Sequence, residues 1–445
     1  MACWLFTRQP ASGFYIHESS CRLQWPDVHG TRAPASFILR DIKPDGEWTP
    51  TMSALFSPRK VGGLNLANRI VVSPMCQYSA IDGIAQPWHL IHVGNLMMSG
   101  AGLVIMEASA VNEVGRGTHG CLGLYSDAHE HALGNLAREA KKLSGAKLGI
   151  QLTHSGRKSS TRTIPERWKG EPLPPEEGAW IPVAPSPLAF DRHWQTPTSL
   201  DAAGIEQITD DFANAASRAA RAGFDLVEIH GAHGYLLHNF LSPLSNQRTD
   251  QWGGSLENRM RFPLAVARAV RAVWPSSRAL GFRLNSTDWH PDGFTLVDAV
   301  LFAKELASAG IDYVVMSSGN IAPGISIPPA SPGHQVPFAT AVKRRTGLIA
   351  MAVGMIARPE QAEAIIAADE ADFVAIGRPM LDNPRWGVHA AAALGVDIDY
   401  PPQYLRARPN NWLGFSYVHP NAKPPATSRQ LDRPPSVAWD RPKGG

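Results

Sequence analysis

The sequence predicts a closed (β/α)8 barrel, a TIM barrel, with a long capping insertion after its third strand. Eight short runs of nearly continuous apolar residues recur along the chain, as is typical of parallel strands covered on both faces. Helical patterns lie between the runs, and this alternation favours either a barrel or an open doubly wound sheet. The eight predicted strands occupy residues 69–75, 102–109, 147–154, 224–230, 279–285, 313–319, 348–354 and 373–379.

The residues after the first predicted strand separate these two folds. An open sheet that binds a dinucleotide is expected to carry G-x-G-x-x-G directly after that strand. The chain continues instead with "CQYSAIDG", residues 76–83. This favours the barrel.

The predicted helices have recognisable ends. Gly223 and Gly310 each follow a long helical pattern, as C-terminal capping glycines do. Pro359 begins another pattern, and proline is common at the first position of a helix. Each of these helices adjoins a predicted strand, as a barrel requires.

The chain is longer than a barrel needs, which is usually about 250 residues. Much of the surplus lies between Gly156 and Leu200, in a stretch rich in proline, tryptophan and charge that we expect to cap the barrel mouth. The first 51 residues show no period of 2 or 3.6, which favours a translation start at Met52 over an appended arm. The expected parts are an N-terminal extension (1–51), a catalytic barrel domain (52–408) and a Pro/Arg-rich C-terminal tail (409–445).

Composition argues against several kinds of partner. The formal net charge is +3 over 445 residues, with no dense Lys/Arg tract, so nucleic acid and anionic membranes are not expected partners. No apolar run approaches the length of about 18 residues that spans a bilayer. The four cysteines form no C-x-x-C pair, which argues against a zinc ribbon, an iron–sulfur centre or a disulfide framework. We therefore expect a reducing, cytoplasmic setting.

Catalytic groups of such barrels lie at the carboxyl ends of the strands. Here these ends carry hydrogen-bond donors and few carboxylates or lysines. These ends carry no pair of acids of the kind that glycoside hydrolysis needs. A Schiff-base aldolase would need a lysine on a strand, whereas Lys304 and Lys343 fall on helical segments. The set suits a large, planar, anionic ligand rich in acceptors. Its members are Cys76, Tyr78, Ala108, Gln151, His154, His230, His233, Tyr235, Arg283, Ser317, Ser318, Gly354, Gly377 and Arg378.

Several long motifs resemble the Old Yellow Enzyme family of flavin-dependent ene-reductases, and in particular its thermophilic-like branch. They are "SPMCQYS", "EASAV", "QLTHSGRKS", "HGAHGYLLHNFLSPLSNQRTDQWGGSLENRMRF", "AVGMI" and "AIGRPMLDNP". The resemblance runs from about residue 55 to 408. It implies a TIM barrel that holds FMN at its mouth, with NADPH or NADH as reductant. It also implies a small, electron-poor alkene as substrate, such as an α,β-unsaturated carbonyl compound.

The resemblance assigns most of the flavin site. Arg283 resembles the arginine beside the flavin pyrimidine ring, and Gln151 can both donate to and accept from the flavin's amide-like edge. Pro74, Met75 and Ala108 match positions that line the isoalloxazine ring. Cys76 marks the branch, since other branches usually have threonine there; without the motif it would be taken for a small buried hydrophobe.

The FMN phosphate is expected near the last two strands. TIM barrels often bind phosphate there, where backbone amides and a cation are available. In this chain the group comprises Gly354, Met355, Gly377 and Arg378.

His230 and His233 lie three residues apart after the fourth predicted strand. A metal site would need a third ligand, and no other Cys/His/acid set gathers at the strand ends, so we expect no metal. The pair is better suited to hold a carbonyl oxygen and stabilise negative charge that develops on it. Tyr235 would then deliver a proton to the substrate carbon opposite the hydride, and Tyr78 would contact the substrate. His238 is expected to be structural.

The branch also implies an arginine that reaches into a neighbouring subunit, here Arg406, and hence a homodimer or homotetramer. The sequence departs from the pattern after "LRARP", so Trp412 or a solvated basic tail are alternatives. Three other functions are alternatives to an ene-reductase. A two-domain dienoyl-CoA reductase would need an iron–sulfur cysteine cluster and a C-terminal dinucleotide domain. An FMN-binding barrel without turnover and a flavin-free lyase or isomerase stay open.

Overall fold

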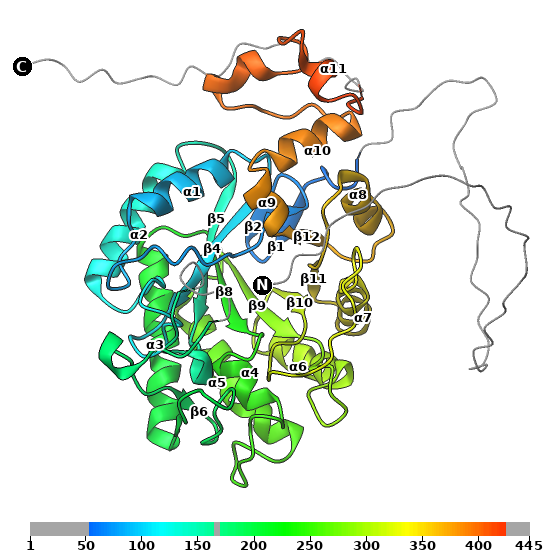
Figure 1. The fold of residues 1–445 in the computed structure, drawn as a ribbon. Coiled ribbons are helices and arrows are strands. Elements are labelled where there is room, and N and C mark those ends of the chain that lie inside the picture. Colours follow the sequence, from blue (N-terminus) through cyan, green and yellow to red (C-terminus); the bar gives the residue numbers. More distant parts are fainter. Residues whose placement is uncertain (1–52, 164–169, 424–445) are drawn as a thin grey trace, which may run out of the picture. The chain divides into compact units, whose positions relative to one another are not determined.

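The computed structural model describes residues 53–163 and 170–423 of the chain. Their centre is a closed barrel of parallel strands, in the ring order β10-β11-β12-β3-β4-β5-β8-β9 (Figure 1). Each predicted run overlaps one of these strands, which confirms the fold class. They are β3 (Ile70–Val72), β4 (Leu103–Ala110), β5 (Lys147–Thr153), β8 (Leu226–Gly231), β9 (Ala279–Asn285), β10 (Tyr313–Ser317), β11 (Ile349–Ala352) and β12 (Phe373–Ile376).

Alternate residues of each strand point to opposite faces of the barrel wall. In β10, Tyr313 and Val315 belong to the cluster inside the barrel, whereas Val314 and Met316 pack towards the helices. Because both faces are covered, the strands are apolar almost throughout, which is why they appear as continuous runs in the sequence. The hairpin β1 (Arg59–Val61) and β2 (Leu64–Leu66) adds its apolar side chains to the inner cluster.

Helices surround the barrel (Figure 1). The side chains of Ser126, Asp201, Ser255 and Thr295 cap four of them by accepting a backbone N–H bond. The predicted helix ends at Gly223 and Gly310 have the expected left-handed φ of +88° and +85°. The helices are α1 (Pro87–Met97), α2 (Asp127–Ala140), α3 (Ala202–Arg221), α4 (Leu236–Leu241), α5 (Leu256–Val273), α6 (Leu296–Ser308), α7 (Val336–Thr346), α8 (Pro359–Ala367), α9 (Arg378–Asp382), α10 (Trp386–Leu394) and α11 (Phe415–Val418). Across residues 53–163 and 170–423, none of the helices is both long and apolar enough to cross a membrane.

The segment from 409 onward differs in part from the expected tail. After the short helix η3 (Pro402–Ala407), its described residues form α11. Phe415 is buried, and its ring lies 4.5 Å from that of His419 and 6.0 Å from that of Trp412. The aromatic residues give this short stretch a small core of its own, which its lack of sequence periodicity conceals.

The insertion after β5 contains the short helices η1 (Gly156–Lys158) and η2 (Pro175–Glu177) and the parallel pair β6 (Val183–Ala184) and β7 (Thr198–Ser199). Trp180 attaches it to the segment after β4 by donating a hydrogen bond to the Val114 carbonyl at 3.0 Å. The Arg116 guanidinium lies 5.6 Å from the Trp180 ring centroid. The insertion therefore reaches over the carboxyl ends of β4 and β5.

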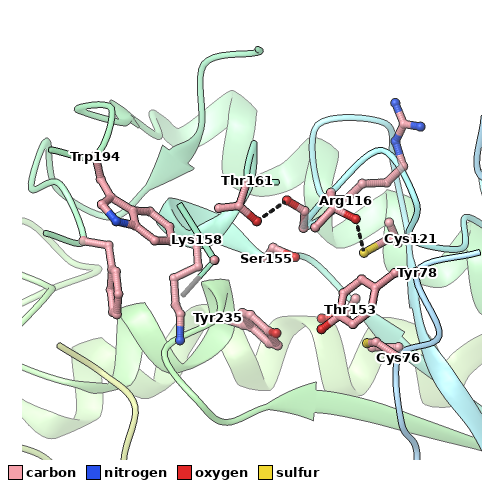
Figure 2. A pocket seen from close by; sticks show the side chains of 16 residues that line it. Cys76, Tyr78, Arg116, Cys121, Thr153, Ser155, Lys158, Thr161, Trp194 and Tyr235 are labelled. Atoms are coloured by element: carbon pink, nitrogen blue, oxygen red, sulfur yellow. Dashed lines mark hydrogen bonds between the residues drawn. The ribbon is translucent and has the colours of Figure 1, made fainter. Parts of the chain in front are cut away.

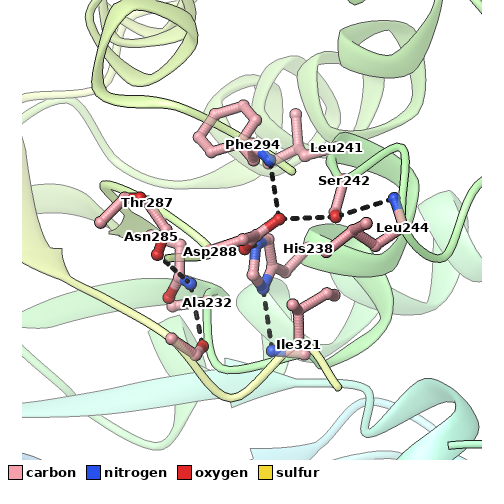
Figure 3. A network of polar contacts seen from close by, with 12 residues as sticks. Ala232, His238, Leu241, Ser242, Leu244, Asn285, Thr287, Asp288, Phe294 and Ile321 are labelled. Carbon is pink, nitrogen blue, oxygen red and sulfur yellow. Dashed lines mark hydrogen bonds and ion pairs between the residues drawn. The ribbon is translucent and has the colours of Figure 1, made fainter. Parts of the chain in front are cut away.

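A buried polar network holds the loop after β8 (Figure 3). His238 Nε2 lies 2.9 Å from the Asp288 carboxylate, while His238 Nδ1 accepts the Gly234 N–H at 2.9 Å. Asp288 also accepts from the Ser242 hydroxyl and the Phe294 N–H. The network joins the chain after β8 to the chain after β9, so His238 has the expected structural role.

Candidate functional site

A cavity of about 320 Å³ lies at the carboxyl end of the barrel (Figure 2). One wall comes from the loop after β3 and from β4, including Cys76, Tyr78 and Ala108. Tyr235 lies on the opposite side, at the start of α4. Lys158, Phe190 and Trp194 bring the insertion into the same cavity. The predicted cap therefore forms part of the wall.

The two histidines from the opening of the β8–α4 loop face one another. Nε2 of His230 is 3.3 Å from Nδ1 of His233, and the rings are nearly perpendicular. Nδ1 of His230 accepts the Ala232 N–H at 3.2 Å, so a neutral His230 carries its proton on Nε2. Two ring nitrogens thus converge on one position beside Tyr235, whose ring lies 4.9 Å from that of His230.

Ser317 bonds the far side of the second histidine. Its Oγ is 2.7 Å from Nε2 of His233. A serine hydroxyl can donate or accept, so it allows His233 to carry its proton on either nitrogen. When the hydroxyl donates, Nδ1 of His233 bears the proton and both imidazoles present an N–H to the same point.

Burial keeps these imidazoles neutral. It lowers the pKa of His230 and of His233 well below the ordinary value, and the nearby charge of Arg283 lowers both further. Within the part of the chain that the structure describes, no group of three or more His, Cys, Asp or Glu side chains could hold a metal ion. The pair is therefore arranged as neutral hydrogen-bonding groups.

The tyrosines of the cavity stay protonated. Burial raises the pKa of Tyr235 and of Tyr78 above that of free tyrosine. Tyr235 is the residue that immediately precedes α4, so a short helix fixes its backbone. Lys158 lies 5.5 Å from its ring centroid and donates hydrogen bonds to the carbonyls of His233 and Asn320. Burial lowers the Lys158 pKa to about 8.

Three predicted site residues have left-handed backbone angles. Tyr78, His233 and Met355 have φ of +52°, +57° and +49°. Such angles are uncommon outside glycine and concentrate at functional sites, where surrounding contacts hold them. For His233 the contact is Asn285, whose side chain accepts its backbone N–H at 3.1 Å.

Of the residues expected beside the flavin pyrimidine ring, Gln151 is buried, and Arg283 is half-buried and incompletely paired. Nη1 of Arg283 donates to Ser73 at 3.3 Å, whereas Nε of Arg283 has no hydrogen-bond partner among the described residues. An unpaired buried guanidinium N–H is costly and points to an absent acceptor. The Gln151 side chain donates a hydrogen bond to Glu228 of β8. Gln151 lies on β5, which pairs with β8, and β8 pairs with β9, the strand that carries Arg283. This donor set fits the carbonyl and nitrogen acceptors of FMN.

The residues expected at the phosphate lie on adjacent strands. Gly354 and Met355 follow β11, and Gly377 and Arg378 follow β12, which pairs with β11. Gly354 has φ of +102°, and a Cβ there would lie 2.5 Å from Gln335, so only glycine fits. Arg378 is exposed at the start of α9, with its guanidinium free to meet an anion. Amides and a cation at this rim suit the phosphate of FMN.

The remaining flavin-side residues follow β3. Met75 lies close to Gly377, since a Cβ on that glycine would be 3.5 Å from its sulfur. Pro74 and Met75 are half-buried in the same segment as Cys76. Burial raises the Cys76 pKa well above its ordinary value, so the thiol is neutral and a weak donor.

Some cavity groups escaped the sequence argument. Lys158 stands in the quoted motif "QLTHSGRKS" but was given no role, and Phe190 lies in an insertion without periodicity. Ser317 was recognised only as a strand end. In the other direction, Arg406 is exposed on η3 and is not among the residues that line this cavity.

The lowered histidine pKa values predict a stability profile. His230, His233 and His154, whose pKa burial lowers to about 3, stay neutral in the folded chain. Below the unfolded value of about 6.5 the unfolded chain binds more protons, so the free energy of unfolding falls as pH is lowered. We expect His154→Gln to reduce this slope by up to about 1.4 kcal/mol per pH unit in urea unfolding from pH 7.5 to 5. A slope that is unchanged in this variant would contradict a neutral His154.

Comparison with known proteins identifies the family. The family model described as the NADH:flavin oxidoreductase / NADH oxidase family matches residues 54–395. An NADPH dehydrogenase of Geobacillus thermodenitrificans (strain NG80-2) is 43% identical over 357 residues, covering 80% of this chain and 98% of that protein. The NADPH dehydrogenase of Listeria innocua serovar 6a is 42% identical over 359 residues, covering 80% and 99%.

A solved structure agrees with these sequence relatives. Morphinone reductase in complex with tetrahydroNAD superposes with a TM-score of 0.64 at 30% identity, covering 78% of this chain and 93% of that one. The chain therefore belongs to the NADH:flavin oxidoreductase family, which is the Old Yellow Enzyme family, with FMN as cofactor and NAD(P)H as reductant.

Proposed function

We propose that the protein is an ene-reductase, which reduces the C=C bond of α,β-unsaturated carbonyl compounds or related electron-poor alkenes in a ping-pong cycle. The observation that carries this proposal is the approach of His230 Nε2 to His233 Nδ1, 3.3 Å apart, next to Tyr235, which lines the cavity although the two histidines themselves do not. Bound FMN would supply the chemistry of hydride transfer between NAD(P)H and the alkene.

The histidine pair holds the substrate oxygen. A carbonyl oxygen placed between the two ring nitrogens accepts an N–H from each, and the negative charge that develops as the alkene is reduced is stabilised there. Neutral imidazoles suit this role, because they donate without the need to expel a counter-ion from a buried site. The same pair would hold the carboxamide of NAD(P)H in the other half of the cycle, which explains why two different ligands can share one cavity.

Ser317 lets the pair switch between two hydrogen-bonding states. In the unliganded arrangement His230 donates to His233, so His233 Nδ1 is an acceptor. A ligand oxygen requires an N–H there instead, and the Ser317 hydroxyl makes it possible by donating to Nε2 at 2.7 Å. Ser317 is thus a positioning residue that acts through His233.

Tyr235 is the proton donor in this mechanism. Burial raises the pKa of its phenol, so the proton is present at neutral pH and leaves only for a strongly basic centre such as an enolate-like carbon. The hydroxyl belongs to a residue that lines the cavity, and the histidine pair keeps the substrate carbonyl beside it. Tyr78, on the facing wall, contacts the substrate.

We further propose that the protein forms a homodimer or homotetramer in which Arg406 completes the cavity of a second copy. Arg406 is exposed, and the large apolar side chains of Trp412 and Leu413, which follow it in the sequence, are exposed too. Such apolar exposure favours a protein contact.

Three further predictions concern the reductant, the substrate and the location. We expect a preference for NADPH, which the relatives named NADPH dehydrogenase support. We also expect a small electron-poor alkene as substrate and a cytoplasmic location.

Tyr235→Phe should separate the two half-reactions. In anaerobic stopped-flow experiments, reduction of bound FMN by NADPH should persist, because no proton from Tyr235 is needed. Reoxidation by cyclohexenone should slow on the order of 100-fold, the usual contribution of a general acid. Tyr78→Phe is the matched control, since it removes a phenol from the same cavity and should slow reoxidation far less. Normal reoxidation in Tyr235→Phe would remove Tyr235 as donor, and failure of cyclohexenone to reoxidise the wild type would refute ene-reduction of enones.

Ser317→Ala should weaken ligand binding more than chemistry. Without the hydroxyl, the N–H of His233 on Nδ1 loses its support, and loss of a hydrogen bond of about 1 kcal/mol corresponds to roughly a fivefold rise in KM for cyclohexenone. Ser317→Thr keeps a hydroxyl and should restore most of the affinity. Steady-state kinetics decide the matter: equal KM values in the wild type and both variants would show that Ser317 does not position His233.

The proposed assembly predicts a particle of at least twice the 48.2 kDa chain mass in light scattering after gel filtration. Arg406→Ala should leave that mass unchanged and raise KM for cyclohexenone, because a cation is lost from the neighbour's cavity. A monomer with full activity would contradict both parts of this proposal.

A further inference from the structure

Glu228 is a wholly buried carboxylate that the mechanism above does not use. It lies in β8, and one oxygen accepts the Gln151 Nε2–H at 2.6 Å while the other accepts the Tyr313 hydroxyl at 3.0 Å. Removing a carboxylate from water is expensive, and buried acids persist where a charge or hydrogen bonds compensate them. Its presence in an otherwise apolar barrel interior therefore needs an explanation.

The barrel register places this group in one layer. Gln151 of β5 pairs with Glu228 of β8, which pairs with Gly281 of β9, and Gly281 pairs with Tyr313 of β10. A Cβ at residue 281 would lie 2.0 Å from the Tyr313 ring. The glycine thus leaves the space through which Tyr313 crosses β9 to reach Glu228.

The next layer towards the barrel mouth carries the site. His230 lies two residues beyond Glu228 on the same face of β8, and its register partner is Arg283 of β9. Arg283 is half-buried, and Glu228 is the foremost charged group acting to raise its pKa against desolvation. Arg283 in turn opposes the rise that burial causes in the Glu228 pKa. A guanidinium stays charged in proteins, so this pair is best satisfied as a carboxylate and a cation.

A carboxylate at this position dictates which end of the Gln151 amide is available. Carboxylate oxygens only accept, so Gln151 must turn its Nε2 to Glu228, as the 2.6 Å bond has it. Its Oε1 is then left for an N–H donor. A neutral amide at 228 could instead donate to Gln151, and the Gln151 amide would be free to present its NH2 group.

We propose that Glu228 is a positioning residue for the flavin, which fixes Gln151 with Oε1 towards the N–H of the pyrimidine edge and offsets the charge of Arg283. This inference rests on the proposed placement of that edge over Gln151 and Arg283. The Glu228–Arg283 pair, drawn from two adjacent layers, is then electrically neutral as a whole, while one acceptor (Gln151) and one cation (Arg283) are left for the flavin. Glu228 would thereby hold the reduction potential lower than Arg283 alone would set it.

The test is Glu228→Gln in the FMN-loaded protein, with two readouts independent of alkene turnover. The uncompensated Arg283 favours the anionic reduced flavin, whereas the reoriented Gln151 loses its bond to the pyrimidine-edge N–H in both redox states, so the change in potential comes from Arg283. We expect the ratio of the FMN dissociation constants, oxidised over reduced, to rise about tenfold, which for a two-electron couple is about +30 mV in midpoint potential. Potential is measured by anaerobic equilibration with a reference dye, and oxidised FMN affinity by the fluorescence of released flavin.

Tyr313→Phe is the matched control, because it removes the other hydrogen bond to Glu228 and keeps the carboxylate. We expect it to shift the potential by much less than Glu228→Gln. Equal shifts in the two variants, or a wild-type potential in Glu228→Gln, would overturn the proposal.

A second variant keeps the proposal testable if Glu228→Gln does not fold. Gln151→Met removes the amide but leaves Glu228 and Arg283 in place, so oxidised FMN should bind several-fold more weakly with little change in potential. Unchanged FMN affinity would show that the amide does not face the flavin and would sink the proposal. Neither the midpoint potential nor the FMN affinity depends on enone reduction. A failure of the proposed ene-reductase function and a failure of this inference therefore give different results.

Discussion

The closure of eight parallel strands into one ring is the constraint on which the site depends. Because all strands run in the same direction, every carboxyl end reaches the same rim, and residues far apart in the sequence meet there. The strand register then decides which side chains become neighbours: His230 pairs with Arg283, two positions closer to the barrel mouth than Glu228. A shift of one residue in any of these strands would turn its polar group out of the barrel and towards the helices.

Contacts outside the strands then fix the loop after β8 that carries His233 and Tyr235. The His238–Asp288 network fixes the chain after β8, and the Gly234 amide that His238 accepts belongs to the same loop as His233 and Tyr235. Lys158 binds two carbonyls across that loop from the insertion side. The left-handed angle of His233 is therefore held by contacts from several elements, and its imidazole is aimed before any ligand arrives.

Sequence reasoning recovered the barrel strands, because parallel strands have a strong apolar signature, and it predicted that the proposed site residues share one rim, because the carboxyl ends of the strands lie on one side. It could not give the path of the insertion, which lacks periodicity and is held by single contacts such as Trp180 to Val114. It also missed how side chains pair across strands. In the sequence Glu228 is a lone acid within a strand, and only the register reveals that Gln151 and Tyr313 converge on it. The small aromatic cluster around Phe415 was hidden for the same reason, since its contacts are few and irregular.

The bare backbone at Gly281 has an evolutionary implication. The ring of Tyr313 from the next strand occupies the space that a side chain at position 281 would need, so the residue types at positions 281 and 313 are not independent. A larger residue at 281 is compatible only with a smaller one at 313, and that exchange would strip the buried acid of a donor. Among descendants of this sequence, the two sites should change together or not at all, and designers who wish to reshape the lumen must treat them as one unit.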